Sequence, residues 1–168
     1  ASVTVNPEPV GTPLTPAAIC SEVVTGVTLT VPLAATYNIT SIVDNGLTAS
    51  AGSPATGNGL AADVLADDAW TNTTGSPVNV IYTIVPVSGA SPNNCEGNPF
   101  TVTVTVNPEP VGVATPATQT VCSDTPITTI VLTTSNSLNA STTYAWTRDN
   151  TSGITVLDPS GTGNISGT

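Results

Sequence analysis

The sequence predicts an all-β chain of tandem antiparallel β-sandwich modules, and three observations support this prediction. Short runs in which Val or Ile alternates with Thr recur at intervals of roughly ten residues, as in half-buried strands. Pro, Gly and Asn cluster between these runs and mark turns. In addition, the letters VTVNPEPVG occur twice, at Val3–Gly11 and at Val104–Gly112. An identical block that returns after about 100 residues is typical of repeated small domains.

Each copy of this block joins a strand to a stiff linker. Val-Thr-Val alternates as a strand does, and Asn-Pro-Glu-Pro ends it, because proline has no N–H to donate and holds φ near about −65°. The linker residues are Pro7, Glu8 and Pro9 in the first copy and Pro108, Glu109 and Pro110 in the second. We therefore predict a closing strand of a preceding module at residues 1–6, a complete module at residues 7–106, and the first part of a second, incomplete module at residues 107–168.

Within the complete module the strands are expected in the following order. An irregular edge strand is expected at Val10–Cys20, and regular strands at Val27–Val31, Tyr37–Val43, Val78–Val87 and Phe100–Val106. The segment Leu60–Trp70 has an apolar stripe of helical period without a clear cap, so a turn of helix and an irregular strand are both open. In the second module, strands are expected at Ala117–Cys122, Ile127–Thr133, Thr143–Thr147 and Ile154–Leu157. Such a succession of short strands is typical of the immunoglobulin-like sandwich.

The two strands that end the complete module also predict the core. Alternate residues of each strand point to one face of a sheet. The side chains expected inward are Val78, Val80, Tyr82 and Ile84 from the first strand and Val102, Val104 and Val106 from the second. The threonines between the last three valines are expected to face outward.

Composition excludes most chemistry. The chain has one basic residue, Arg148, against eleven acidic ones, which gives a net charge of −10, and it has no His. Binding to phosphate backbones needs clustered Lys and Arg, so nucleic acid is not an expected partner. The lack of His excludes Ser-His-Asp, Cys-His and His-metal sites. No apolar run approaches the roughly 18 residues of a membrane helix. We expect no enzyme activity, no cofactor and no membrane insertion.

Three cysteines are present, at Cys20, Cys95 and Cys122. Alignment on the repeated block makes Cys20 and Cys122 equivalent positions of successive modules. Cys95 then becomes the expected disulfide partner of Cys20, near the other end of the same module. Such a bridge would stabilise the module by roughly 4 kcal/mol and would indicate an oxidising, extracytoplasmic location. The alternative is three unrelated thiols.

Two further features are candidate sites. Asp63, Asp67 and Asp68 form an acidic cluster that could bind Ca²⁺ through carboxylate oxygens, although solvated surface charge is the commoner explanation of such a cluster. Trp70 is a candidate ligand contact, because an exposed indole stacks on sugar rings. Packing of Trp70 in the core is the competing interpretation.

Several stretches carry a resemblance to a known family. They are Tyr144–Ile154, Gly161–Gly167, Thr71–Thr74, Pro77–Pro86 and Cys95–Val104. These stretches resemble the PKD-like repeats of giant surface proteins of Bacteroidota, which include gliding-motility adhesins exported by the type 9 secretion system. The resemblance implies an immunoglobulin-like fold and an extracellular stalk or adhesive filament on the bacterial cell surface.

The leading functional hypothesis is a structural one. Tandem modules would form a stiff stalk and contact surface of a cell-surface adhesin or filament, with neighbouring modules or filament subunits as partners. One alternative is a carbohydrate-binding module that holds surface glycans through Trp70. The other is a fibre subunit in which Ala1–Val5, whose pattern matches Val102–Val106, completes a neighbouring module by donor-strand exchange.

Overall fold

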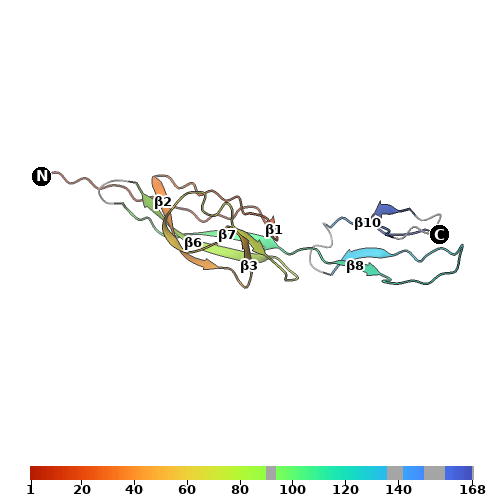
Figure 1. Cartoon of the computed structure of the whole chain (residues 1–168). Coiled ribbons are helices and arrows are strands. Elements are labelled where there is room, and N and C mark those ends of the chain that lie inside the picture. The colour runs from red at the N-terminus through yellow and green to blue at the C-terminus, as the bar shows by residue number, and fades with distance from the viewer. Residues whose placement is uncertain (90–93, 136–141, 150–157, 168) are drawn as a thin grey trace. The chain divides into compact units, whose positions relative to one another are not determined.

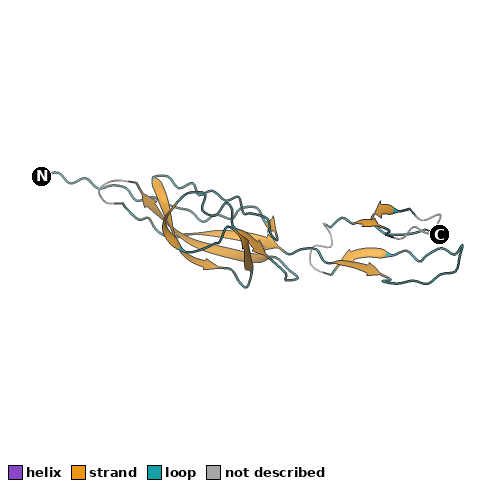
Figure 2. Ribbon diagram, in the orientation of Figure 1, coloured by secondary structure: helices purple, strands orange, loops and turns teal. Residues whose placement is uncertain are grey.

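A computed structural model describes residues 1–89, 94–135, 142–149 and 158–167. The chain divides into two compact units, Ala1–Glu109 and Pro110–Thr168. Strands, turns and extended segments make up the described residues of both units, and no helix occurs among them (Figure 2). Consequently, no described segment could cross a membrane as a helix.

The larger layer of the first unit is a five-stranded sheet. Its strands are β1 (Ile19–Cys20), β2 (Ala34–Val43), β4 (Gly57–Leu60), β6 (Val78–Ser88) and β7 (Phe100–Asn107), in the order β1-β7-β6-β2-β4 (Figure 1). The long strands β6 and β7 are antiparallel, with Val80 opposite Val104 and Tyr82 opposite Val102. Burial alternates along β7 as the sequence predicts, with the valines inward and the threonines half-buried on the other face.

The second layer is smaller and less regular. Strands β3 (Thr48–Ala51) and β5 (Ala69–Thr71) pair antiparallel, with Ala49 opposite Trp70. Side chains of this layer meet those of the larger sheet in one buried cluster. The cluster contains Val27, Leu29, Tyr37, Ile39, Leu47, Leu65, Trp70, Val80, Tyr82, Ile84, Phe100, Val102, Val104 and Val106. Two layers around one core form a β-sandwich, so the predicted all-β, immunoglobulin-like class is confirmed.

Two predicted elements of the complete module differ from the structure. The segment Val27–Val31 forms no strand, although Val27 and Leu29 are buried. Its backbone makes a hydrogen bond to a turn and not to a neighbouring strand, since the Leu29 N–H donates to the Ala62 carbonyl at 2.8 Å. The other is the ambiguous segment before Trp70. It folds as consecutive turns, in which the Ala66 N–H donates to the Asp63 carbonyl at 2.8 Å, and continues into β5. The core is therefore closed here by turns.

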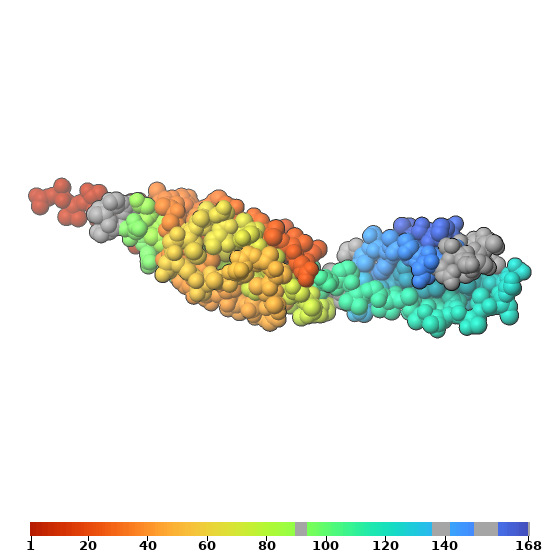
Figure 3. Space-filling view, viewed as in Figure 1, coloured from red at the N-terminus to blue at the C-terminus, as the bar shows by residue number. Residues whose placement is uncertain are grey.

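The N-terminal segment, predicted to close a preceding module, forms no strand with the first unit. The side chains of residues 1–6 are exposed, with Val3 at 88% and Val5 at 85% (Figure 3). A strand needs a partner for its N–H and C=O groups, and no described residue pairs with this segment. Further along, the predicted irregular edge is confirmed: Leu14 bridges Val102, and β1 runs parallel to β7.

The described residues of the second unit form two antiparallel pairs of strands. Strand β8 (Gly112–Thr115) pairs with β9 (Val131–Thr134), and β10 (Ala145–Thr147) pairs with β11 (Ser160–Thr162). A bridge joins Ile130, directly before β9, to Ile165, shortly after β11. The segment predicted as a strand at Ala117–Cys122 has none, and the one at Ile154–Leu157 lies outside the described residues.

The two copies of the repeated block predict different responses to the same substitution. A methyl group on Gly11 would lie 2.2 Å from Cδ1 of Phe100, whose ring is buried, whereas Gly112 has no atom within 4 Å of that position. We expect Gly11→Ala to destabilise the first unit by about 2 kcal/mol through overpacking, and Gly112→Ala to change stability by less than about 0.5 kcal/mol. Urea unfolding of the two variants measures the difference, and equal effects would contradict the packing of Val10–Leu14 on β7.

Candidate functional site

Three polar side chains form a buried chain of hydrogen bonds between the two layers. The Trp70 indole Nε1 donates to the Tyr82 hydroxyl at 3.0 Å, and this hydroxyl donates to Oδ2 of Asp68 at 2.9 Å. Strand β5 positions Trp70, the turn before it positions Asp68, and β6 positions Tyr82. All three are almost fully buried, and Asp68 is only 2% exposed. A buried carboxyl group therefore lies inside the sandwich.

Burial determines the acidity of this group. Loss of solvent raises the pKa of Asp68 to about 6, and the neighbouring charge of Asp67 acts in the same direction, while the hydrogen bond from Tyr82 opposes both. Burial also raises the pKa of Tyr82 well above its usual value. Tyr82 thus remains a neutral donor, and Asp68 changes its charge in mildly acidic solution.

A small cavity lies beside Asp68. It has a volume of about 180 Å³, and its walls are Ile39, Gly52, Ser53, Pro54, Ala55, Thr56, Leu60, Val64 and Asp68. Gly52 makes this arrangement possible, because its φ is +79° and a methyl group there would lie 2.5 Å from Oδ1 of Asp68. The cavity combines apolar walls with one carboxylate, which is the composition expected of a small-ligand site.

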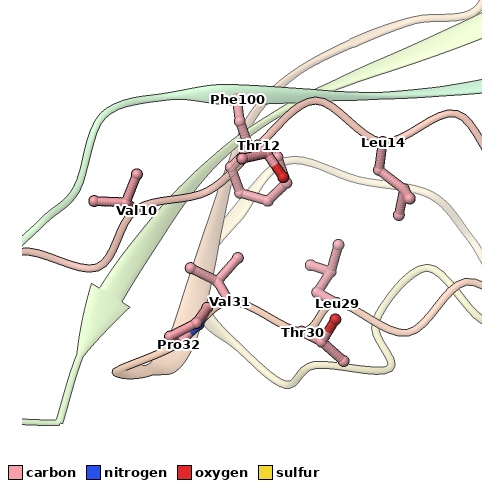
Figure 4. A pocket seen from close by; sticks show the side chains of 8 residues that line it. All are labelled: Val10, Thr12, Leu14, Leu29, Thr30, Val31, Pro32 and Phe100. Carbon is pink, nitrogen blue, oxygen red and sulfur yellow. The ribbon is translucent and has the colours of Figure 1, made fainter.

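A second cavity, of about 280 Å³, lies between two extended segments of the first unit. Val10, Thr12 and Leu14 come from one segment and the residues Leu29–Pro32 from the other, and the ring of Phe100 projects toward Thr12 (Figure 4). Its lining contains no ionisable side chain. Of these two cavities, the one beside Asp68 is therefore the one with an ionisable side chain in its wall.

Asn72 is a second buried polar centre, and it ties three segments together. Its Nδ2 donates to the carbonyls of Val106 at 2.7 Å and Ser76 at 3.1 Å, and its Oδ1 accepts from the N–H of Thr74 at 2.9 Å. The N–H of Asn72 donates to Oγ of Ser21 at 2.9 Å. These bonds hold the end of β7 directly before the second Asn-Pro-Glu-Pro.

The structure separates the three predicted calcium ligands. Asp63 and Asp67 are exposed in the turn, whereas Asp68 is buried against Tyr82. Within the described ranges, no group of three or more His, Cys, Asp or Glu side chains could hold a metal ion. The three carboxyls therefore do not come together as one cluster, because the chain turns Asp68 inward, and solvated surface charge describes Asp63 and Asp67. Sequence spacing could not show this turn.

Trp70 packs in the core and cannot serve as a sugar-stacking platform. Its side chain is 4% exposed, and its indole nitrogen is already bonded to Tyr82. Of the two interpretations of Trp70, core packing is confirmed and the ligand contact is wrong. An indole in this position contributes apolar burial and one internal hydrogen bond.

The predicted bridge between Cys20 and Cys95 is not formed. Cys20 has a free, exposed thiol and lies opposite Asn107, at the end of β7. Cys95 bonds to Ser88 through its backbone, near the start of β7. The eight residues of β7 separate the two positions by more than about 20 Å at 3.3 Å per residue, and a disulfide requires Cα atoms within about 7 Å. The disulfide argument for an extracytoplasmic location loses its support.

The linker residues fall into two classes. Pro9 and Pro108 are fully buried, while Pro7, Glu8, Glu109 and Pro110 are exposed. Pro9 packs against the loop before β7, where a methyl group on Gly97 would lie 1.9 Å from the Pro9 carbonyl oxygen. The division between the units falls between Glu109 and Pro110.

Sequence reasoning missed two residues of these centres. Tyr82 was expected only as an inward side chain of a strand, and its hydroxyl partners were not predictable because they lie on other segments. Asn72 lies in the stretch Thr71–Thr74, and no signal in the sequence indicated its burial.

Comparisons with known proteins point to one family. A search of curated proteins and a search of solved structures found no match. A family model that describes the PKD-like domain matches residues 17–110, which is more than half of the chain and includes every strand of the sandwich of the first unit. PKD-like domains are commonly extracellular, and they fit a structural role there. The chain belongs to the PKD-like domain family.

Proposed function

We propose that this chain is a non-enzymatic structural segment of an extracellular adhesin or filament on a bacterial cell surface. Its PKD-like module would act as a stiff spacer and contact surface, with neighbouring modules or filament subunits as its partners. The observation that carries the proposal is the recurrence of VTVNPEPVG, once before the family domain at Val3–Gly11 and once at its end at Val104–Gly112. Identical ends allow modules to follow one another in series.

The residues support a spacer in two ways. Buried valines on β6 and β7 and the Asn72 centre give the first unit a packed core up to its last strand. The prolines of the Asn-Pro-Glu-Pro linker restrict φ and therefore narrow the range of backbone conformations that the linker can adopt. The resemblance to gliding-motility adhesins suggests the setting, namely secretion by the type 9 system of a member of the Bacteroidota.

A length assay tests the spacer role. Beads would display a small binding domain through zero, one or three copies of the 168-residue chain, beneath a layer of grafted polymer. We expect capture of the ligand of that domain to rise with copy number, and to rise more than with Gly/Ser linkers of equal residue count, because such linkers form compact coils. Equal capture with both kinds of linker would refute a stiff spacer.

Fibre assembly by strand exchange is the second candidate, and one observation favours it. Val3 and Val5 alternate as Val104 and Val106 do in β7, yet they are exposed and unpaired within the described chain. If this segment completes a neighbouring subunit, deletion of Ala1–Val5 should abolish polymers in sedimentation and leave the first unit folded. Polymers that persist after the deletion would exclude this route. The carbohydrate-binding alternative has lost its aromatic platform with the burial of Trp70.

A further inference from the structure

The cavity beside Asp68 has chemistry that a passive spacer does not use. Asp68 is 2% exposed, its Oδ2 accepts from Tyr82, and its Oδ1 has no recorded hydrogen-bond partner in the described chain. Among the described residues, the fully buried side-chain nitrogen and oxygen atoms without a partner belong to Trp146 and Arg148, so Oδ1 of Asp68 keeps some accessible surface. Asp68 is part of the cavity wall. One carboxylate oxygen is thus available to a ligand in the cavity.

The remaining walls define what this oxygen can meet. Ile39, Leu60, Val64 and Pro54 supply an apolar surface, while Ser53 and Thr56 carry the hydroxyl groups of the lining. The volume of about 180 Å³ is of the order of the roughly 150 Å³ that accommodates a benzene-sized molecule. A short aliphatic stem with a single polar head matches this size and this distribution of polarity.

We propose that this cavity binds a primary alkylammonium group, with Oδ1 of Asp68 as the acceptor of the charged head and the apolar walls around the stem. The inference stands apart from the spacer role. No side chain of these 168 residues supplies a primary ammonium group, since Lys is absent from them, so we assign the ammonium group to a partner molecule. The net charge of −10 would favour the approach of such a cation.

Other ligand classes fit less well. A guanidinium group prefers two parallel hydrogen bonds to a carboxylate, but Tyr82 already occupies Oδ2. A metal ion needs several oxygen ligands, and the cavity wall offers one carboxylate, that of Asp68. A sugar needs an aromatic face, which the cavity lining lacks. An ammonium group needs one good anionic acceptor and can direct its other N–H groups to hydroxyls or water.

The acidity of Asp68 supplies a test. Tyr82 and Asp67 are the ionisable groups that act on this carboxyl, and the cavity walls from β2, β4 and the loop after β3 add none. Since burial raises the pKa of Asp68 to about 6, the acceptor is mostly protonated at pH 5 and mostly charged at pH 7. We expect binding of an alkylammonium ion to be about tenfold weaker at pH 5 than at pH 7.

The experiment titrates n-butylamine into the full chain and follows backbone amide shifts by NMR. Saturable shifts at Gly52 and Asp68 are expected at pH 7. They should weaken at least tenfold in Asp68→Asn and persist in Asp63→Asn, which removes the same charge from an exposed position. Ala55→Leu, which enlarges a wall side chain, should weaken binding while leaving Asp68 intact. Butanol, which has no charge, should bind at least tenfold more weakly than butylamine.

Comparison of two probes distinguishes the source of the ammonium group. If Nα-acetyl-lysine N-methylamide also produces saturable shifts, the ligand is the lysine side chain of a partner protein. If only butylamine does so, the ligand is a small free amine. Equal binding by wild type and Asp68→Asn, or no saturable shift with either probe, would overturn the proposal.

Discussion

Replacement of Asn72 by Ala is expected to lower the free energy of unfolding of the first unit by about 4 kcal/mol. The substitution removes the Nδ2 donor, so the Val106 carbonyl, which lies 2.7 Å from Nδ2, is left buried without this hydrogen bond. It also removes Oδ1, which accepts from the Thr74 N–H. Each unsatisfied buried group costs about 1 to 3 kcal/mol. Asn72 is fully buried, so water cannot replace the amide without opening the site.

Denaturant unfolding monitored by tryptophan fluorescence measures this effect. A Trp146→Phe background restricts the signal to Trp70 in the first unit. Asn58→Ala serves as the matched control, because Asn58 is exposed on β4, and we expect it to change stability by less than about 0.5 kcal/mol. A loss below about 1 kcal/mol in Asn72→Ala would show that the centre does not hold the end of β7.

The second large effect is expected in the pH dependence of stability. The pKa of Asp68 rises from 3.8 to about 6 on folding, so the folded chain holds this proton more tightly than the unfolded chain. The stabilisation is complete below about pH 4 and is lost as the pH rises through about 6. At about 1.4 kcal/mol per pH unit, the loss amounts to about 3 kcal/mol.

Asp68→Asn should remove this loss, because its side-chain oxygen still accepts from Tyr82 and carries no charge. We expect the variant to be more stable than wild type by up to about 3 kcal/mol at pH 7 and nearly equal to it at pH 4. Thermal and urea unfolding between pH 4 and 7 measure the difference. The exposed control Asp63→Asn should keep the wild-type slope, and a wild-type slope in Asp68→Asn would contradict the buried carboxyl.

Strands with strict alternation were predictable from the sequence. Val80, Tyr82 and Ile84 on β6 and Val102, Val104 and Val106 on β7 are fully buried, as their period of two indicates. The signal is local, because successive side chains of a strand point to opposite faces. Where burial depends on a distant segment, as at Val27–Val31, the pattern predicted the buried side chains correctly and the hydrogen bonding wrongly.

The candidate site was only partly accessible to sequence reasoning. Asp68 was recognised as acidic, but its separation from Asp63 and its contact with Tyr82 depend on a turn and on a strand from another part of the chain. The prediction of a disulfide between Cys20 and Cys95 failed for the same reason. Their spacing from the repeated block does not show which end of β7 each thiol lies near. Partners that are distant in sequence become neighbours only through the fold.

The repeated block shows which features the local sequence determines and which features depend on the tertiary structure. Local chemistry alone determined that the chain is all-β, that the second Asn-Pro-Glu-Pro follows the end of a strand and that the chain carries no His and one basic residue, since proline geometry, alternation and charge are properties of the local sequence. Only the tertiary structure decided that Val104 and Val106 are buried while the identical Val3 and Val5 are exposed. A strand forms where a neighbouring strand satisfies its backbone and an opposite layer covers its side chains, and neither condition is encoded in the block itself.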